Sequence, residues 1–160
     1  MKQNAVILFS LILPLYMVAQ SNVGDKIIKK EGLYYLNDGL CTGVYLSYHT
    51  NGVVASKEGY FKGHPNGLWT WWWKNGQKKK EENYIYKNGC SYRDGFVYEW
   101  YENGNLMQKE TYKDGLRHGK WYKYDKRGTI VLKGVCSYGE LVSGDKVPVP
   151  VSCSRRMVSY

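Results

Sequence analysis

Five aromatic side chains in this chain are candidates for binding another molecule. Trp69, Trp71 and Trp73 alternate with other residues over five positions, and Tyr101 and Trp121 hold related places in later copies of the same pattern. Tryptophans and tyrosines that gather on one exposed face bury much apolar area when a partner docks. The chemistry that these residues predict is therefore non-covalent docking. The alternative, which the sequence leaves open, is that they only pack on one another.

A second candidate surface is basic. Lys78, Lys79 and Lys80 follow one another, and Lys62 and Lys74 precede them in the same repeated pattern. Together these lysines could contact anionic lipid headgroups. We favour the structural interpretation, in which they form a solvated strand and pair with glutamates of neighbouring strands.

Residues that support catalysis or metal binding are present without the spacing that such sites need. The histidines at 49, 64 and 118 share no ligand spacing, and no Cys-x-x-Cys pair occurs. No nucleophile elbow is visible, and no glycine-rich loop precedes a helix. We therefore expect no enzymatic activity, no metal site and no cofactor.

The four cysteines, Cys41, Cys90, Cys136 and Cys153, permit three pairings. Cys41 and Cys90 lie two repeats apart, too far for a bond that needs Cα atoms within about 7 Å. Cys136 and Cys153 could meet if the C-terminal tail folds back. We predict a disulfide between these two.

A repeated unit of 24 residues, stretched to 28 in one copy, positions all these side chains. Two series of glycines mark it, and nine residues separate the series in every copy. A period of this length predicts stacked units of one supersecondary structure. The predicted turn glycines are Gly43, Gly67, Gly95 and Gly119 in one series, and Gly52, Gly76, Gly104 and Gly128 in the next.

Each unit is predicted to be one β-hairpin. Its first half is rich in aromatic and β-branched residues and ends in Asn-Gly, or in Arg-Gly in the last copy, which is a strong signal for a tight hairpin turn. The second half returns to a turn such as Lys-Asp-Gly. Successive hairpins should pair edge to edge, and no helical periodicity competes with this interpretation. Residues 26–38 are predicted to be the return strand of an incomplete first unit.

Two segments depart from the pattern. Four extra residues around 88–94 should lengthen one turn, so that Cys90 and Tyr92 project from the regular edge. The segment Val147–Pro150 contains two prolines and cannot continue a central strand. We expect residues 140–160 to form an extended cap that protects the last edge strand.

Alternation along the strands separates two faces. We expect the first face to be the packed one; it carries Val44, Leu46, Tyr48, Leu68, Thr70, Trp72, Phe96, Tyr98, Trp100, Lys120, Tyr122 and Tyr124. We expect the second face, with the five candidate aromatic residues, to be exposed and to bind the partner.

The first 19 residues are predicted to be a signal peptide that is cleaved after Ala19. Lys2 is followed by an apolar stretch from Ala5 to Ala19, which is short for a membrane span and typical of an export signal. The mature chain would then be periplasmic, associated with the outer envelope or secreted. Its net charge of +8, one less than the full chain's +9 because Lys2 is lost, would suit an acidic partner or a phospholipid surface, or would only keep the sheet soluble. Export argues against nucleic acid.

The repeat resembles the bacterial variant of the MORN (membrane occupation and recognition nexus) repeat. Residues 67–76 and 119–128 carry its Gly-x-Trp start, and Glu82–Tyr84 and Glu110–Tyr112 carry its second half. The resemblance covers roughly residues 30–139, after a lead-in at 20–29. Departures in the later units indicate that the last unit is a cap; they are Val97 for an aromatic residue, Arg127 for asparagine and Cys136 for tyrosine.

The resemblance implies an all-β fold, an elongated single-layer antiparallel sheet of tandem β-hairpins. It also implies a role in protein association, with phospholipid binding in some members. The antitoxin-like label of bacterial members fits an exported chain poorly. We predict an exported, non-enzymatic interaction module for a protein partner. The alternatives are an anionic membrane surface, a glycan, or antitoxin-like or immunity-like neutralisation of a partner.

Overall fold

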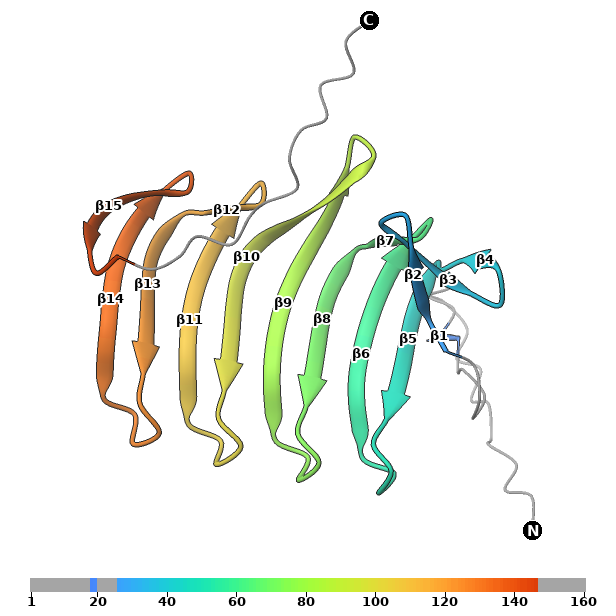
Figure 1. Cartoon of the computed structure of the whole chain (residues 1–160), viewed down its shortest axis with the longest axis horizontal. Coiled ribbons are helices and arrows are strands. Elements are labelled where there is room, and N and C mark those ends of the chain that lie inside the picture. The colour runs from blue at the N-terminus through green and yellow to red at the C-terminus, as the bar shows by residue number, and fades with distance from the viewer. Residues whose placement is uncertain (1–17, 20–25, 147–160) are drawn as a thin grey trace, which may run out of the picture.

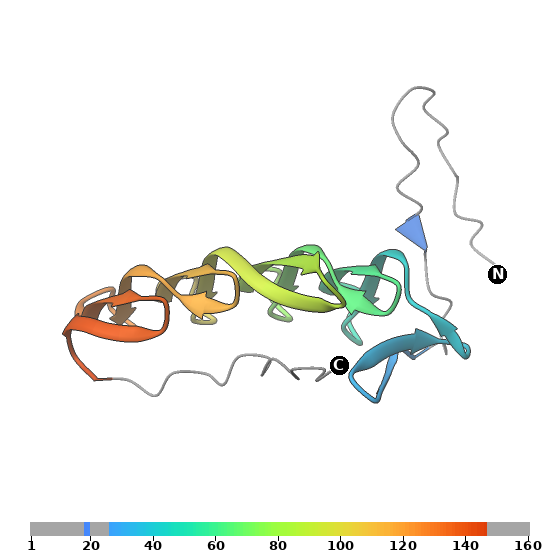
Figure 2. The same cartoon turned by 90° about the horizontal axis from the view of Figure 1, so that it is seen from above.

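The computed structural model of this chain describes residues 18–19 and 26–146, and within them it is an antiparallel sheet of tandem hairpins, as predicted (Figure 1). Four hairpins follow one another in chain order. They are β5 (Gly43–Tyr48) with β6 (Val54–Phe61), β8 (Gly67–Trp72) with β9 (Lys78–Lys87), β10 (Cys90–Trp100) with β11 (Leu106–Lys113), and β13 (Gly119–Tyr124) with β14 (Ile130–Ser137). Figure 2 shows them as a single row seen from above.

Shorter strands complete this sheet at its ends and along its upper edge. The strand β15 (Glu140–Gly144) continues the sheet beyond β14, and β1 (Val18–Ala19) pairs in parallel with β5. The two-residue strands β7 (His64–Pro65) and β12 (Leu116–Arg117) pair with β6 and β11. In the part of the chain that the structure describes, no helix has the length and apolar character needed to cross a membrane.

The turns that join the two strands of each hairpin, which we call the lower turns from their place in Figure 1, are tight, as predicted, but only their glycine has a positive φ. In the turn after β8, the Gly76 amide donates to the Trp73 carbonyl at 2.9 Å, and the Trp73 amide donates to Gln77 O at 2.8 Å. Gly76 has a φ of 83°, whereas the φ of Asn75 is not positive. The turn therefore contains one left-handed residue, as in a type I turn followed by a glycine bulge.

The asparagine of each lower turn links its hairpin to the next one. Its Oδ1 accepts from the backbone amide two residues later, and its Nδ2 donates to a carbonyl of the following turn. The inter-repeat bonds run from Asn51 to Lys74 O at 2.8 Å, from Asn75 to Glu102 O at 2.8 Å, and from Asn103 to Lys126 O at 3.0 Å. Arg127 holds this position in the last lower turn, after which no further lower turn follows among the described residues.

We expect Asn75→Asp to lower the free energy of unfolding by about 1–2 kcal/mol. Aspartate keeps the acceptor for the Gln77 amide but places an oxygen against the carbonyl of Glu102. Urea denaturation followed by circular dichroism measures the change. The matched control is Arg127→Asp, which should change stability by no more than about 0.5 kcal/mol. Equal losses in the two variants would contradict the role of the asparagine.

The four extra residues extend a hairpin instead of lengthening its turn, which corrects our expectation. The turn between β9 and β10 is still two residues long, Asn88 and Gly89, both with positive φ. The added length lies in the strands, which have 10 and 11 residues, and the hairpin rises above its neighbours in Figure 1. A register shift between Arg93 and Val97 absorbs the mismatch with β9. Cys90 is half-buried on this extension.

The prediction of which face is packed is wrong. Trp69 is 5% exposed and Trp121 is fully buried, whereas Leu68 and Phe96 on the other face are 52% and 51% exposed. We call the face with Tyr45, Trp69, Val97 and Trp121 the inner face and the opposite one the outer face. Gly67, the first residue of β8, has a φ of 83°. No atom lies within 4 Å of the position that a Cβ would take at Gly67, so conformation rather than space requires glycine there.

The N-terminal segment covers one end of the inner face. The strands β2 (Ile28–Lys30), β3 (Leu33–Leu36) and β4 (Gly39–Leu40) form a separate three-stranded sheet. Tyr34 packs against Tyr60 and Trp69, with ring centroids 4.9 and 6.0 Å apart. Residues 26–38 are therefore a small sheet that packs on the first repeats, and the prediction that they form one return strand is wrong. The physical reason is the Glu31–Gly32 turn between β2 and β3, whose positive φ angles fold the segment back on itself.

Two predicted regions lie largely outside the described residues. Only Val18 and Ala19 of the predicted signal peptide are described, and the tail is described only to Lys146. Cys153 falls outside as well, while Cys136 is buried and forms no disulfide with another described cysteine. The Cys136–Cys153 disulfide therefore stays a prediction.

Candidate functional site

A repeated glutamate–tyrosine pair organises the inner face. The tyrosine two residues after each glutamate donates its hydroxyl hydrogen to that carboxylate, because alternate residues of a strand share a face. The oxygen–oxygen distances are 2.6 Å for Tyr60 and Glu58, 2.6 Å for Tyr84 and Glu82, and 2.7 Å for Tyr112 and Glu110. Glu82 and Glu110 are each only 3% exposed, so their charges need partners inside the protein.

Arginines supply these partners in two of the repeats. Arg93 Nε lies 2.9 Å from Glu82 Oε2, and Arg117 Nη2 lies 2.5 Å from Glu110 Oε1. Both arginines stand two residues before a glycine of the repeat, Gly95 within β10 and Gly119 at the start of β13. Glu58 instead accepts from Trp71 Nε1 at 3.0 Å. These contacts of the buried glutamates were not predicted, although the Arg-x-Gly and Glu-x-Tyr spacings are visible in the sequence.

The same network changes the acidity of its tyrosines. Burial, followed by the hydrogen bond to Glu110, raises the pKa of Tyr112 from 10 to about 12. Burial and the neighbouring carboxylates also raise the pKa of Tyr60 and Tyr84. A buried phenol beside a carboxylate resists ionisation, because the phenolate would lose hydration and face a like charge.

This shift predicts unfolding in alkali. Because the folded-state pKa of Tyr112 exceeds the unfolded one, its contribution to stability is complete below pH 10 and is lost as the pH rises through about 12. Titration followed by absorbance near 295 nm and by circular dichroism measures both events. We expect a late, cooperative group of tyrosines to ionise together with loss of the sheet. Ionisation of every tyrosine near pH 10 with the sheet intact would contradict the network.

The structure gives each of the five candidate docking residues a structural role. Trp69 and Trp121 are buried and cannot meet a partner directly. Trp71 donates to Glu58, Trp73 Nε1 donates to Trp100 O at 3.2 Å, and the Tyr101 hydroxyl donates to Tyr124 O at 2.8 Å. The last two bonds join consecutive hairpins. Binding by the partly exposed Trp71, Trp73 and Tyr101 stays untested.

The five candidate lysines do not form one surface. Lys62 lies in an upper turn and Lys74 in a lower one. Lys78 pairs with Glu81 and lies 5.7 Å from the Trp100 ring on the outer face, while Lys80 lies 3.1 Å from Glu82 on the inner face. Lys79 lies over Trp73 at 4.5 Å. A lipid-binding patch made of these five residues therefore has no common face.

An apolar row crosses the outer face just above the lower turns, and we call it the outer belt. It consists of one cross-strand pair from each hairpin, and seven of its eight residues are apolar. The pairs are Tyr48–Val54, Trp72–Lys78, Trp100–Leu106 and Tyr124–Ile130. Tyr48 is 49% exposed and Ile130 is 47% exposed.

A repeated β-bulge builds this belt. Each belt pair follows a register shift, at which the return strand carries one residue more than the outgoing strand. A bulge re-aims the side chains that follow it. Tyr98 and Phe96 extend a column of rings upward from the belt residue Trp100, with successive ring centroids 5.6 Å apart. Lys109 lies over Phe96 at 5.1 Å.

Comparison with known families agrees with this geometry. A sequence model described as the MORN repeat variant matches residues 42–62, 65–88 and 93–114. Three consecutive segments of the chain therefore match the MORN repeat variant, and they correspond to the first three hairpins. Such repeats suggest a repeat-based binding module. No curated protein and no solved structure matches the chain.

The fourth hairpin lies outside the matched MORN repeats but has the same register. Gly134 and Cys136 stand where the other hairpins carry glutamate and tyrosine. The Trp121 ring occupies the space of the missing glutamate, since a Cβ on Gly134 would lie 2.6 Å from its Cζ2. Among the described residues, no group of three histidine, cysteine or acidic side chains could hold a metal ion.

Proposed function

We propose that this chain is an exported, non-enzymatic MORN repeat module that docks a protein partner through its outer belt. The observation that carries the proposal is the row of seven apolar residues at the same level of four consecutive hairpins. Eight strands at about 4.8 Å give a belt roughly 35–40 Å long. A belt of that length matches the width of a protein interface better than that of a small ligand.

The division between the faces supports the outer face as the docking side. On the inner face, the large aromatic residues are buried or bonded to neighbouring repeats. The belt keeps Trp72, Trp100 and Tyr124 partly exposed. Tryptophan and tyrosine dominate the binding energy of many protein interfaces.

Charge indicates the chemistry of the partner. Lys78 lies beside the Trp100 ring, and Lys109 lies beside Phe96 and Tyr98. The whole chain has a net charge of +9. A complementary partner would present an apolar ridge with acidic residues at its rim.

The experiment is capture of envelope proteins on the immobilised chain, followed by affinity measurement with the purified partner. We expect the double variant Trp72→Ser/Trp100→Ser to weaken binding about 30-fold or more, as loss of a hot spot worth about 2 kcal/mol requires. The matched control is Val142→Ser, because Val142 is apolar and 64% exposed but lies on β15, away from the belt. Circular dichroism checks that all variants are folded.

Two outcomes would contradict the proposal. One is unchanged affinity of the folded double variant. The other is binding only to anionic vesicles and loss of that binding as salt rises, since contact through the apolar belt should survive high ionic strength. The second outcome would favour membrane attachment.

A further inference from the structure

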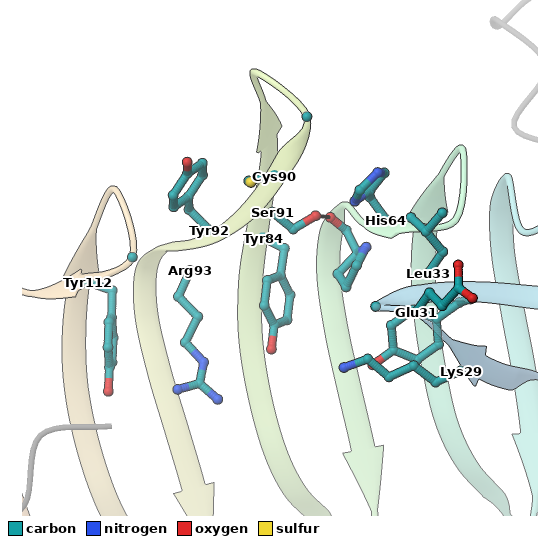
Figure 3. A pocket seen from close by; sticks show the side chains of 15 residues that line it. Lys29, Glu31, Leu33, His64, Tyr84, Cys90, Ser91, Tyr92, Arg93 and Tyr112 are labelled. Atoms are coloured by element: carbon teal, nitrogen blue, oxygen red, sulfur yellow. Dashed lines mark hydrogen bonds between the residues drawn. The ribbon is translucent and has the colours of Figure 1, made fainter. Parts of the chain in front are cut away.

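The stretched repeat forms one wall of a cleft on the inner face. A cavity of about 600 Å³ opens between the N-terminal sheet and the upper part of β9 and β10 (Figure 3). Its volume is in the range of small-molecule sites. It lies against the inner-face tyrosines, on the opposite side of the sheet from the outer belt, so it goes beyond the proposed function.

The walls of the cleft are fixed by short contacts. On one side, the Tyr34 amide donates to Gly63 O at 2.9 Å, which holds the N-terminal sheet to the repeats. On the other side, Ser91 Oγ donates to Pro65 O at 2.6 Å, which ties the extended hairpin to its neighbour. The Gly115 amide donates to the carbonyl of Arg93 at 2.9 Å. A site whose walls are held in this way loses little entropy on binding.

The charged residues of the cleft favour an anionic group. Arg93 and Lys29 line it, and Figure 3 shows Tyr84 standing between them. The Arg93 guanidinium is oriented by Nε, which contacts Glu82, and its Cζ lies 5.5 Å from the Tyr112 ring centre. A guanidinium fixed at one edge presents its planar donors to a carboxylate. The acidic residue of the lining is Glu31.

The remaining lining favours a ring that is polar at its edge. Four tyrosines contribute, whereas the aliphatic lining is limited to Leu33 and Pro65. A peptide side chain or a lipid tail would need more aliphatic surface than this. A sugar ring has apolar faces that pack on tyrosine rings and hydroxyl groups that meet polar side chains at the rim. We propose that the cleft binds an acidic saccharide, with carboxylates at Lys29 and at Arg93 on the two sides of Tyr84.

The test is calorimetric titration of the full chain with digalacturonate and with digalactose, the neutral analogue of the same size. We expect digalacturonate to bind with a dissociation constant of about 1 mM or lower, and digalactose at least about tenfold more weakly. No binding of digalacturonate, or equal binding of the two sugars, would overturn the proposal.

Two charge reversals on the same strand locate the binding. Lys29→Glu should weaken digalacturonate binding at least about tenfold, because it removes a charge-assisted contact. Lys30→Glu is the matched control, since Lys30 is an exposed neighbour outside the cleft lining, and should change affinity by less than about twofold. Glu31→Gln should tighten binding. Equal weakening by the two lysine variants would overturn the proposal, because it would show attraction by overall charge.

Discussion

Arg117→Met is expected to destabilise the folded chain by about 3–5 kcal/mol. The side chains of Arg117 and Glu110 are each 4% exposed, and their contact is the most deeply buried ion pair that the structure describes in residues 18–19 and 26–146. Methionine fills similar space but leaves the Glu110 carboxylate with only the hydroxyl of Tyr112. Because domains of this size are stable by about 5–15 kcal/mol, the variant should lose a large share of its stability.

Chemical denaturation measures this loss, and two further variants identify its cause. The double variant Glu110→Gln/Arg117→Met should recover much of the stability, since it removes both charges. Lys87→Met is the surface control, because its pair with Asp114 spans 3.6 Å between side chains that are more than half and one half exposed. It should cost less than about 1 kcal/mol. Equal effects of Arg117→Met and Lys87→Met would contradict a buried network.

Gly134→Ala is expected to destabilise the chain by about 3 kcal/mol, at the upper end of the usual cost of overpacking. The new Cβ would lie 2.6 Å from Cζ2 of Trp121 and 2.7 Å from the Ser143 carbonyl oxygen. Trp121 is fully buried and cannot turn aside. Gly134→Glu, which restores the residue of the other repeats, should be worse still.

Thermal unfolding compares these variants with Lys133→Ala, an exposed neighbour on the same strand. That control should change stability by no more than about 0.5 kcal/mol. If Gly134→Glu stabilised the chain, as a return to the repeat pattern would suggest, the fourth hairpin would not be packed as described.

The sequence was sufficient to predict the hairpins, because glycine and asparagine act locally. Each turn requires positive φ at a fixed place, and the spacing between the turns determines the strand length. The asparagine ladder could not be predicted, because it joins positions such as Asn75 and Glu102 that approach only after two hairpins have paired. Its end is visible in the sequence only as the change to Arg127.

The choice of faces could not be predicted from alternation alone. In a single-layer sheet both faces carry aromatic residues, and alternation does not say which side is covered. The inner face is covered at one end by the N-terminal sheet, whose Tyr34 packs against Trp69. Glutamates such as Glu82 looked solvent-exposed in the sequence, yet they are buried because a tyrosine and an arginine partner them.

The cleft could not be predicted from the sequence for a different reason. The extra residues around 88–94 could be recognised as an irregularity, but a longer turn and a longer hairpin give the same count. The structure places them in β9 and β10, which brings Arg93 beside Glu82. Because the cleft needs both this extension and the distant Lys29, no short stretch of the sequence has a pattern that would predict it.

Hydroxyl-radical footprinting of the free chain tests the assignment of the two faces most directly. We expect fast oxidation of Tyr48 and Phe96, which are about half exposed, and strong protection of Trp69 and Trp121 despite the high intrinsic reactivity of tryptophan. Fast oxidation of Trp69 and Trp121 with protection of Tyr48 and Phe96 would mean that the faces are reversed, and the outer belt could not be the docking surface.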